Sequence, residues 1–388
     1  MGTIEKFDSY VMGTYGRYPL VMEKGENCRC VDENGNYYVD FGSGIGTNSL
    51  GYCDSDWVEA VCNQAKTLQH TSNYYYTKVQ ADFAAKLCSA TGYAKVFFGN
   101  SGAEANECAI KLARKYSFDK YGENRNKIIT LQNSFHGRTM CTLSATGQDV
   151  FHNYFFPFMQ GFDYAQANNI DDLEAKLDGS VCAVMIEFVQ GEGGVNVLDE
   201  DFVRDLFELC KSKDILVIAD EVQTGIGRTG KLLAAQNYNV RADITTLAKG
   251  LAGGLPIGAC LVKDKCAEVL TKGMHGSTFG GNPVCCAGGN AVLNKVCDAN
   301  FLDEVVRKGR YIRARLEALD EVVSVSGMGL MIGVTLKTKN AADVAKLCLE
   351  NGLLVLTAKE KLRFLPPLTI SQHEIEAGME ILEKLLSN

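Results

Sequence analysis

Short apolar runs alternate with amphipathic stretches through the middle of this 388-residue chain. The apolar runs are nearly continuous, which is typical of strands buried on both faces of a parallel sheet. The amphipathic stretches between them have the spacing of crossover helices. The pattern therefore predicts an α/β architecture with a mostly parallel central sheet, whose strands are Val96–Phe98, Lys127–Leu131, Cys182–Ile186, Ile215–Ala219 and Ile244–Ala248.

Two helices in this region are well marked. Ser101, followed three residues later by Glu104, has the spacing of a capping box. Apolar residues then follow at helical intervals: Ala105, Ala109, Leu112, Ala113 and Tyr116. The second helix runs through Phe202, Val203, Leu206, Phe207 and Cys210.

The pattern changes after about residue 283, where two long amphipathic helices (283–298 and 301–318) precede strand-like runs at 322–325 and 330–336. We expect a further helix, two short strands and a terminal helix to complete a smaller α+β domain. Turn-forming residues at 33–36 indicate a small N-terminal sheet. The predicted division is an N-terminal segment (1–45) that packs with the small domain, a large domain (46–282) and the small domain (283–388).

Charge and cysteine content narrow the possible partners. The formal net charge is −8, and proteins that bind nucleic acid backbones are usually basic. The fifteen cysteines are scattered, many in apolar runs, which suits a reducing cytosol. We therefore expect a cytoplasmic enzyme with no nucleic-acid partner, no metal site, no signal peptide and no membrane span.

Candidate chemistry lies where each predicted strand ends. The strands lead to Gly99–Ala103, Phe135–Arg138, Glu187, Asp220 and Lys249. Ligands of open parallel sheets bind beyond the carboxyl ends of the strands, so these residues are expected to converge. Backbone N–H groups of Ser101, Gly102 and Ala103 at a helix start could bind a phosphate, although an ordinary capped turn has the same sequence.

Lys249 and Asp220 form the most informative pair. An amine at the end of a buried strand loses hydration, which lowers its pKa toward a neutral nucleophile that forms Schiff bases. A carboxylate such as Asp220 keeps a pyridine nitrogen protonated, and Gln223 could bind a ring hydroxyl. These are the groups that pyridoxal phosphate chemistry needs. The alternatives are a solvated turn for Lys249 and a helix N-cap for Asp220.

Other residues extend this hypothesis. Phe135 could stack on a flat ring and Arg138 could hold a carboxylate, against core packing and a surface ion pair as the alternatives. Ser277 and Thr278 lie in a polar loop and could bind a phosphate. Arg363, a lone cation in an apolar strand, needs an acidic partner or an anionic ligand.

A glycine-rich segment also matches two nucleotide-binding patterns. Gly225–Gly230 has the spacing of a dinucleotide fingerprint, and Gly225–Lys231 spells most of a P-loop. Leu232 stands where a P-loop needs Ser or Thr, and the fingerprint lacks its βαβ context. A tight loop that carries Arg228 is the better interpretation, with a nicotinamide-dependent oxidoreductase as the distant alternative.

Taken together, these motifs resemble the class III pyridoxal-phosphate-dependent aminotransferases. The resemblance is nearly full length, from Tyr15 to Leu368, in order and at the family's spacing. Its most specific parts are Asn100–Glu107, Ser134–Thr139, Gln190–Gly194, Asp220–Gly225 and the surroundings of Lys249.

The resemblance implies a fold type I homodimer with shared active sites. It implies that Lys249 carries the cofactor as a Schiff base, with Asp220 at the ring nitrogen. The other implied cofactor contacts are Ser101, Gly102, Ala103, Phe135, Val222, Gln223 and, from the partner chain, Thr278. The implied substrate contacts are Arg138, Ser277 of the partner chain, Glu192, Arg363, Tyr15 and Ile45, with Glu192 masking Arg363 until 2-oxoglutarate binds.

The implied reaction transfers the δ-amino group of N-acetylornithine to 2-oxoglutarate, a step of arginine biosynthesis. Ile45 favours an acylated donor, because ornithine-specific relatives typically carry tyrosine there. Succinylornithine, 4-aminobutyrate and free ornithine remain alternative donors. Tyr52 and Phe188 depart from the family's usual histidine and proline, which leaves the local loop geometry open.

Overall fold

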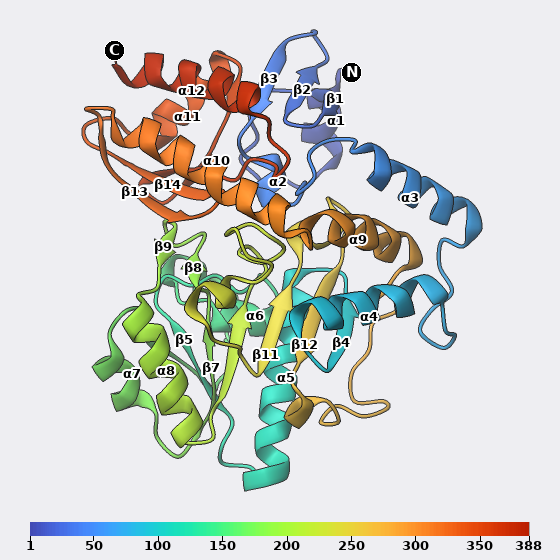
Figure 1. The fold of residues 1–388 in the computed structure, drawn as a ribbon. Coiled ribbons are helices and arrows are strands. Elements are labelled where there is room, and N and C mark those ends of the chain that lie inside the picture. The colour runs from blue at the N-terminus through green and yellow to red at the C-terminus, as the bar shows by residue number, and fades with distance from the viewer. Residues whose placement is uncertain (388) are drawn as a thin grey trace.

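A seven-stranded sheet organises the protein, whose computed structural model describes residues 1–387. The strand order is β4-β12-β11-β10-β7-β5-β6, and only β12 runs antiparallel to its neighbours (Figure 1). The strands are β4 (Lys95–Gly99), β5 (Lys127–Leu131), β6 (Phe162–Ala165), β7 (Val181–Ile186), β10 (Leu216–Asp220), β11 (Ile244–Leu247) and β12 (Gly258–Val262).

All five strands predicted from the apolar runs belong to this sheet. Each observed bound lies within about one residue of its predicted bound. The apolar pattern did not predict β6 and β12. Strand β6 is only half buried, and β12 returns directly from β11 without a crossover helix, so neither follows the strand–helix alternation.

Helices cover both faces of the sheet. Helix α5 (Gly102–Tyr121) packs Cys108, Ala109 and Leu112 into one apolar cluster with the central strands. Helices α7 (Ile170–Lys176) and α8 (Glu200–Ser212) pack against the opposite face. Burial on both faces explains why the strands read as continuous apolar runs.

The start of α5 corrects one detail of the prediction. Ser101 Oγ accepts the N–H of Glu104 at 3.1 Å, as a capping residue does. The Glu104 carboxylate does not return to Ser101, because it accepts the N–H of Asn100 at 2.6 Å and the Asn100 side-chain amide at 2.8 Å. The capping box was therefore right for Ser101 and wrong for Glu104.

The N-terminal and C-terminal segments share a second sheet. Strands β1 (Met22–Glu26), β2 (Arg29–Asp32) and β3 (Tyr37–Asp40) are joined by β15 (Leu353–Leu354), which pairs in parallel with β3. This pairing supports the expected packing of the first 45 residues with the C-terminal region. The boundaries at residues 45 and 282 stay predictions.

A third sheet and three helices complete the C-terminal region. The sheet contains β13 (Val322–Met328), β14 (Met331–Leu336), β17 (Lys361–Phe364) and β16 (Leu356–Ala358). The helices are α10 (Ala299–Glu317), α11 (Ala341–Glu350) and α12 (Gln372–Ser387). We expected two short strands after α11, but the structure has β15, β16 and β17.

The remaining helices connect these regions. Helix α9 (Pro283–Val296) packs against α3 (Ser55–Thr67) and α4 (Lys78–Thr91) beside the large sheet (Figure 1). The shorter elements are α1 (Thr3–Tyr10), α2 (Ser43–Gly46), α6 (Met140–Ala145), β8 (Val189–Gln190) and β9 (Asn196–Val197).

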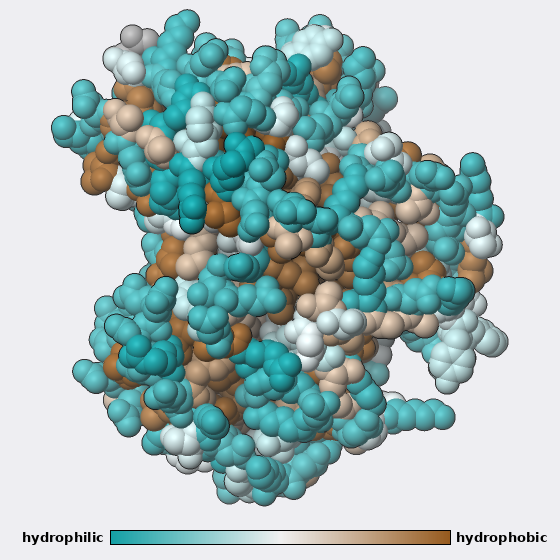
Figure 2. All heavy atoms as spheres, in the orientation of Figure 1, coloured by the Kyte–Doolittle hydropathy of each residue, from teal (hydrophilic) through white to brown (hydrophobic). Residues whose placement is uncertain are grey.

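Polar residues dominate the molecular face shown in Figure 2, and apolar residues appear mainly between its upper and lower parts. Among residues 1–387, no helix combines the length and apolar character needed to cross a membrane.

Asp54 caps the N-terminus of α3 and forms an ion pair with α9. Its Oδ1 accepts the N–H of Trp57 at 3.2 Å, and its Oδ2 lies 2.5 Å from Lys295 Nζ. We predict that Asp54→Ala lowers the free energy of unfolding by about 1 kcal/mol, because it removes the cap and the ion pair. Thermal unfolding followed by fluorescence of Trp57, the only tryptophan, measures the effect.

Asp56→Ala is the control, because Asp56 also pairs with Lys295 but is exposed and does not cap α3. Equal losses of unfolding free energy in the two variants would contradict the role assigned to Asp54.

Candidate active site

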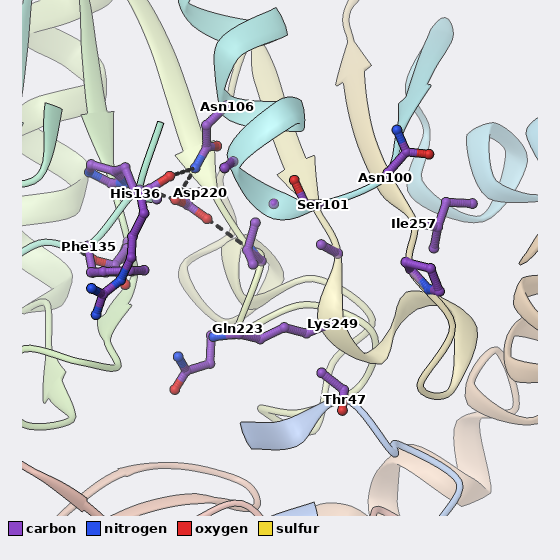
Figure 3. Close-up of a pocket in the computed structure, with 18 of the residues that line it drawn as sticks. Thr47, Asn100, Ser101, Asn106, Phe135, His136, Asp220, Gln223, Lys249 and Ile257 are labelled. Carbon is purple, nitrogen blue, oxygen red and sulfur yellow. Dashed lines mark hydrogen bonds and ion pairs between the residues drawn. The ribbon is translucent and has the colours of Figure 1, made fainter. Parts of the chain in front are cut away.

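A pocket of about 410 Å³ opens at the carboxyl ends of the large-sheet strands (Figure 3). The loops after β4, β5, β7, β10 and β11 all contribute to its lining. Nine residues predicted from the sequence line it: Ser101, Gly102, Ala103, Phe135, Arg138, Asp220, Val222, Gln223 and Lys249. The convergence expected for an open α/β sheet is therefore present.

Asp220 is fixed at one end of the pocket by three neighbours. Its Oδ2 accepts the side-chain amide of Asn106 at 2.8 Å and lies 2.8 Å from His136 Nδ1, and its Oδ1 accepts the N–H of Val222 at 3.1 Å (Figure 3). Asn106 is itself held, because Thr246 donates its hydroxyl to Asn106 Oδ1. Only 4% of Asp220 is exposed, so its carboxylate is oriented before any ligand binds.

Asp220 is not the helix N-cap that its sequence also allowed. The chain forms a turn after β10 rather than a helix, and the bond from Val222 is local to that turn. The neighbouring Glu221 points elsewhere: it accepts the N–H groups of Ala234 and Ala235, and burial raises its pKa to about 7.

Lys249 begins a short 3₁₀ turn directly after β11, with a backbone φ of +41°. A left-handed φ is uncommon for a residue with a side chain and is found often at functional sites. Ser49 secures the turn by donating its hydroxyl to the Gly250 carbonyl at 2.8 Å. Burial lowers the pKa of the Lys249 amine, although the charges of Glu192, Asp220 and Glu187 oppose the shift. Lys249 is only partly exposed and lines the pocket, so this is not the solvated turn considered from the sequence.

The first turn of α5 provides a close-fitting backbone surface. A Cβ at Gly102 would lie 2.7 Å from Cγ1 of Val222, and one at Gly258 would lie 2.1 Å from the Ser101 carbonyl oxygen. Side chains are thus excluded on both sides of the turn. The N–H groups of this helix start face no preceding helical carbonyl, which makes the turn suited to an anion.

Glu187 supports the aromatic side of the pocket. It accepts the N–H of Phe135 at 2.9 Å and the N–H of Gly191 at 3.4 Å. Burial raises its pKa well above the usual value, and the charge of Asp220 raises it further. The Phe135 ring lines the pocket, while the exposed Arg138 lies over the neighbouring ring of Phe151 at 5.0 Å. Arg138 is thus available to a ligand rather than held in the surface ion pair that its sequence also allowed.

Arg363 has the acidic partner that its sequence context required. Its Nη1 lies 2.6 Å from Glu192 Oε1, and Gln223 bonds weakly to both. Burial opposes ionisation of Glu192 and is the largest single influence. The charge and hydrogen bond of Arg363, with smaller contributions from Lys249 and Gln223, together outweigh it, so the pKa of Glu192 is lowered. Nε of Arg363 is buried without a hydrogen-bond partner. Gln223 links this ion pair to the pocket.

Six predicted site residues do not line the pocket within one chain: Tyr15, Ile45, Ser277, Thr278, Glu192 and Arg363. The last two meet the lining through Gln223. Tyr15 is exposed, Thr278 is exposed and Ile45 is 44% exposed. Ser277 accepts the side-chain amide of Asn100 at 3.1 Å from just outside the lining.

Sequence reasoning also missed several lining residues. It gave no role to His136, which contacts Asp220 in the pocket. Asn106 was overlooked because it follows Ser101 on a face of α5 that otherwise reads as apolar. The sequence did contain a signal for both residues, because His136 follows the end of β5 and Asn106 lies near the start of α5. The other lining residues missed are Thr47, Gly137 and the stretch Gly254–Ile257.

The Gly225–Gly230 segment is the tight loop that carries Arg228. Arg228 donates to the carbonyl oxygens of Leu330 and Pro366, and burial lowers its pKa to about 9. No helix begins in this segment, so the dinucleotide pattern lacks the geometry that would bind a pyrophosphate.

Comparison with known proteins agrees with this site. The Aminotransferase class-III family matches residues 10–386. The chain belongs to the class III aminotransferases. The resemblance in sequence, the fold type I α/β architecture and the expectation of an aminotransferase are all confirmed.

Individual relatives extend along the whole chain. An acetylornithine aminotransferase from Haemophilus ducreyi is 53% identical, covering 99% of this chain and 98% of its own. The structure is similar to an N-acetylornithine aminotransferase from Stenotrophomonas maltophilia (34% identity, TM-score 0.85, 99% and 98% covered). It is also similar to a Toxoplasma gondii ornithine aminotransferase with partial occupancy of PLP at its active site (34% identity, TM-score 0.94, 99% and 93% covered).

The lowered pKa of Lys249 predicts its reactivity. In protein freed of small ligands, Lys249 should react with an amine-selective acylating reagent at a lower pH than exposed lysines, because only the neutral amine is nucleophilic. Labelling should fall as the pH drops through the lowered pKa. Peptide mass spectrometry across pH measures this, with the exposed Lys78 as the internal reference. Labelling of Lys78 before Lys249 would contradict the lowered pKa.

Proposed function

We propose that this protein transfers the δ-amino group of N-acetylornithine to 2-oxoglutarate with pyridoxal phosphate as cofactor. The observation that carries the proposal is the pairing of Lys249, an amine whose pKa is lowered by burial, with the fixed carboxylate of Asp220 in one pocket. The names of the similar enzymes support the choice of substrate.

The pocket fits this cofactor at each of its functional groups. The N–H groups at Gly102 and Ala103 would hold the phosphate, Phe135 and Val222 would lie against the ring, Asp220 would pair with the ring nitrogen and Gln223 with the ring hydroxyl. When bound, pyridoxal phosphate supplies an aldehyde for the amine and a protonated ring that withdraws electrons from the substrate carbon.

Lys249 then acts on the substrate. Its Nζ removes the proton from the carbon that bears the transferred amine, as a general base. A neutral amine is required for this role, and desolvation in the pocket favours that form. The exposed guanidinium of Arg138 would bind the α-carboxylate of the donor through paired hydrogen bonds.

The Glu192–Arg363 pair accounts for two substrates in one site. With Arg363 neutralised by Glu192, a donor that has a single free carboxylate meets no unpaired cation beyond Arg138. 2-Oxoglutarate has a second carboxylate, which would displace Glu192 and form a bidentate pair with Arg363. The remaining free Nε of Arg363 is consistent with such a ligand.

We propose a homodimer that completes each site. Ser277 and Thr278 of the partner subunit would reach the substrate and the phosphate. This agrees with the position of both residues outside the pocket of their own chain and with the exposure of Thr278. The exposed tyrosines Tyr74, Tyr75 and Tyr76 adjoin this loop, since Asn73 donates to the Gly280 carbonyl. Exposed apolar surface of this kind marks interaction sites.

The identity of the amine donor rests on fewer contacts. The apolar side chain of Ile45 favours an acylated amine over the charged α-amine of ornithine. Its position near Thr47, which lines the pocket, and its 44% exposure support contact with a bound donor. Succinylornithine, 4-aminobutyrate and ornithine are the alternatives that the experiment below compares.

The test compares kcat/KM for these four donors with 2-oxoglutarate as acceptor, while the visible absorbance of the holoenzyme is recorded. We expect N-acetylornithine to give the highest value and to bleach the visible band. Lys249→Ala should lower turnover about a thousandfold or more, because both the covalent attachment point and the base are lost. Full turnover by Lys249→Ala would refute the proposal, and a higher value for another donor would reassign the substrate.

A second prediction separates the two half-reactions. Arg363→Lys should raise KM for 2-oxoglutarate about tenfold or more, because an ammonium cannot form the bidentate pair. The single-turnover reaction with N-acetylornithine should change little, since Arg363 is neutralised during that step. Stopped-flow absorbance measures the two half-reactions separately, and equal losses in both would contradict the masking role of Glu192.

A further inference from the structure

A second cavity of about 410 Å³ lies away from the active-site pocket, beside β4, β12 and α5. Its lining includes three cysteines, Cys108, Cys260 and Cys266, and the imidazole of His275. Each cysteine is about 1% exposed, so the cavity is the route by which small molecules reach them. None of these residues takes part in the proposed transamination.

The polar groups around Cys108 form a chain. The ammonium of Lys111 can only donate, and its Nζ lies 3.0 Å from His275 Nδ1. Nδ1 therefore accepts, which leaves the proton of a neutral imidazole on Nε2. Lys111 also donates to the Met274 carbonyl at 3.2 Å, and the ring of His275 packs against Phe97 at 4.7 Å. His275 is thus held in place from two sides.

Cys108 differs chemically from the other buried cysteines of the chain. Hydrogen bonds from Cys260 and His275 and the charge of Lys111 lower the pKa of the Cys108 thiol to about 6, although burial acts against them. The pKa of Cys260 is raised, first by its hydrogen bond to Cys108. Burial raises the pKa of Cys182, Cys210 and Cys286 to between about 11 and about 12. A thiolate is the nucleophilic form of cysteine, so Cys108 and Cys260 are paired as attacking and resolving thiols.

Three cysteines and a histidine in one cavity also resemble a metal site. Among the described residues, however, no group of three or more His, Cys, Asp or Glu side chains is arranged to hold a metal ion. A thiol of lowered pKa beside a thiol of raised pKa is the arrangement of an oxidisable pair.

We propose that Cys108 and Cys260 are a site of reversible oxidation by hydroperoxides, entered through the cavity lined by His275. The Cys108 thiolate attacks one peroxide oxygen, the O–O bond breaks, and Cys108 becomes a sulfenic acid as hydroxide leaves. Cys260 then attacks that sulfur and forms the disulfide, and the sulfenic hydroxyl leaves as water with the proton of the Cys260 thiol. The hydroxide from the first step takes the proton that the Cys108 thiol released and becomes the second water. In total, two thiols and one hydrogen peroxide give one disulfide and two waters.

The disulfide would link α5 to β12, two elements that frame the active-site pocket. Cys108 lies two residues after Asn106, which binds Asp220, and Cys260 pairs in register with Thr246, which binds Asn106. The oxidisable pair and the carboxylate of the active site are therefore connected by one hydrogen-bonded residue.

The test treats the purified holoenzyme with hydrogen peroxide at pH 7 and maps disulfides in non-reduced peptides by mass spectrometry. We expect a Cys108–Cys260 link that forms before the exposed Cys53, Cys62 and Cys297 are oxidised and that dithiothreitol reverses. Cys62→Ser is the matched control and should leave the link intact. Free Cys108 after the exposed cysteines have reacted, or a link from Cys108 to Cys266, would overturn the proposal.

The role of His275 has its own readout. His275→Gln should slow oxidation of Cys108 about tenfold at pH 7, because the thiol loses one hydrogen-bond donor and its thiolate fraction falls. The other charged and titratable groups that line the cavity are Lys95, Glu268 and Lys272, and they are unchanged in this variant. Raising the pH should restore the rate. A rate that is independent of both pH and His275 would show that Cys108 is an ordinary thiol.

Discussion

Desolvation of the Lys249 amine is the constraint on which the rest of the site depends. An ammonium that is moved out of water loses hydration, and only nearby negative charge can compensate. Asp220 and Glu187 line the pocket, and the charge of Glu192 also acts on Lys249. Each carboxylate has other partners: Asp220 binds Asn106 and His136, Glu187 binds backbone N–H groups, and Glu192 binds Arg363. The carboxylates oppose the shift without reversing it, and the amine keeps a lowered pKa.

The presence or absence of a cationic partner also explains why the pKa values of Glu187 and Glu192 shift in opposite directions. Glu187 has no cationic partner in direct contact, so burial raises its pKa, whereas Glu192 has Arg363 and its pKa is lowered. A charged Glu192 is required to neutralise Arg363. The two glutamates lie only five positions apart in sequence, so their difference comes from the structure around them.

Sequence patterns predicted the elements and strand ends well, because both follow from burial. The five continuous apolar runs became strands of one sheet, and their ends brought Lys249, Asp220 and Ser101 together. Strand β12 was missed because it pairs antiparallel with β11, the strand that precedes it in the chain. No crossover helix separates the two strands, so β12 does not follow the strand–helix alternation. His136 and Asn106 were missed for a different reason: their role depends on a contact with Asp220 across about a hundred residues of chain, which spacing alone does not encode.

The exposed loop that carries Thr278 is suited to add a side-chain hydroxyl to the phosphate-binding end of the pocket. The first turn of α5 offers backbone N–H groups to a phosphate, and the pocket lining that contains this turn also includes Ser101. Thr278 belongs to a loop that accepts hydrogen bonds from the side chains of Asn73 and Asn100 of the same chain. Thr278 itself is exposed and does not line the pocket of its own chain. A loop that hydrogen bonds hold in place, and that carries an exposed hydroxyl, is suited to bind a neighbouring subunit. Such a loop loses little conformational entropy when it docks. In the proposed homodimer, the exposed loop of one subunit would therefore lie beside the site of the other.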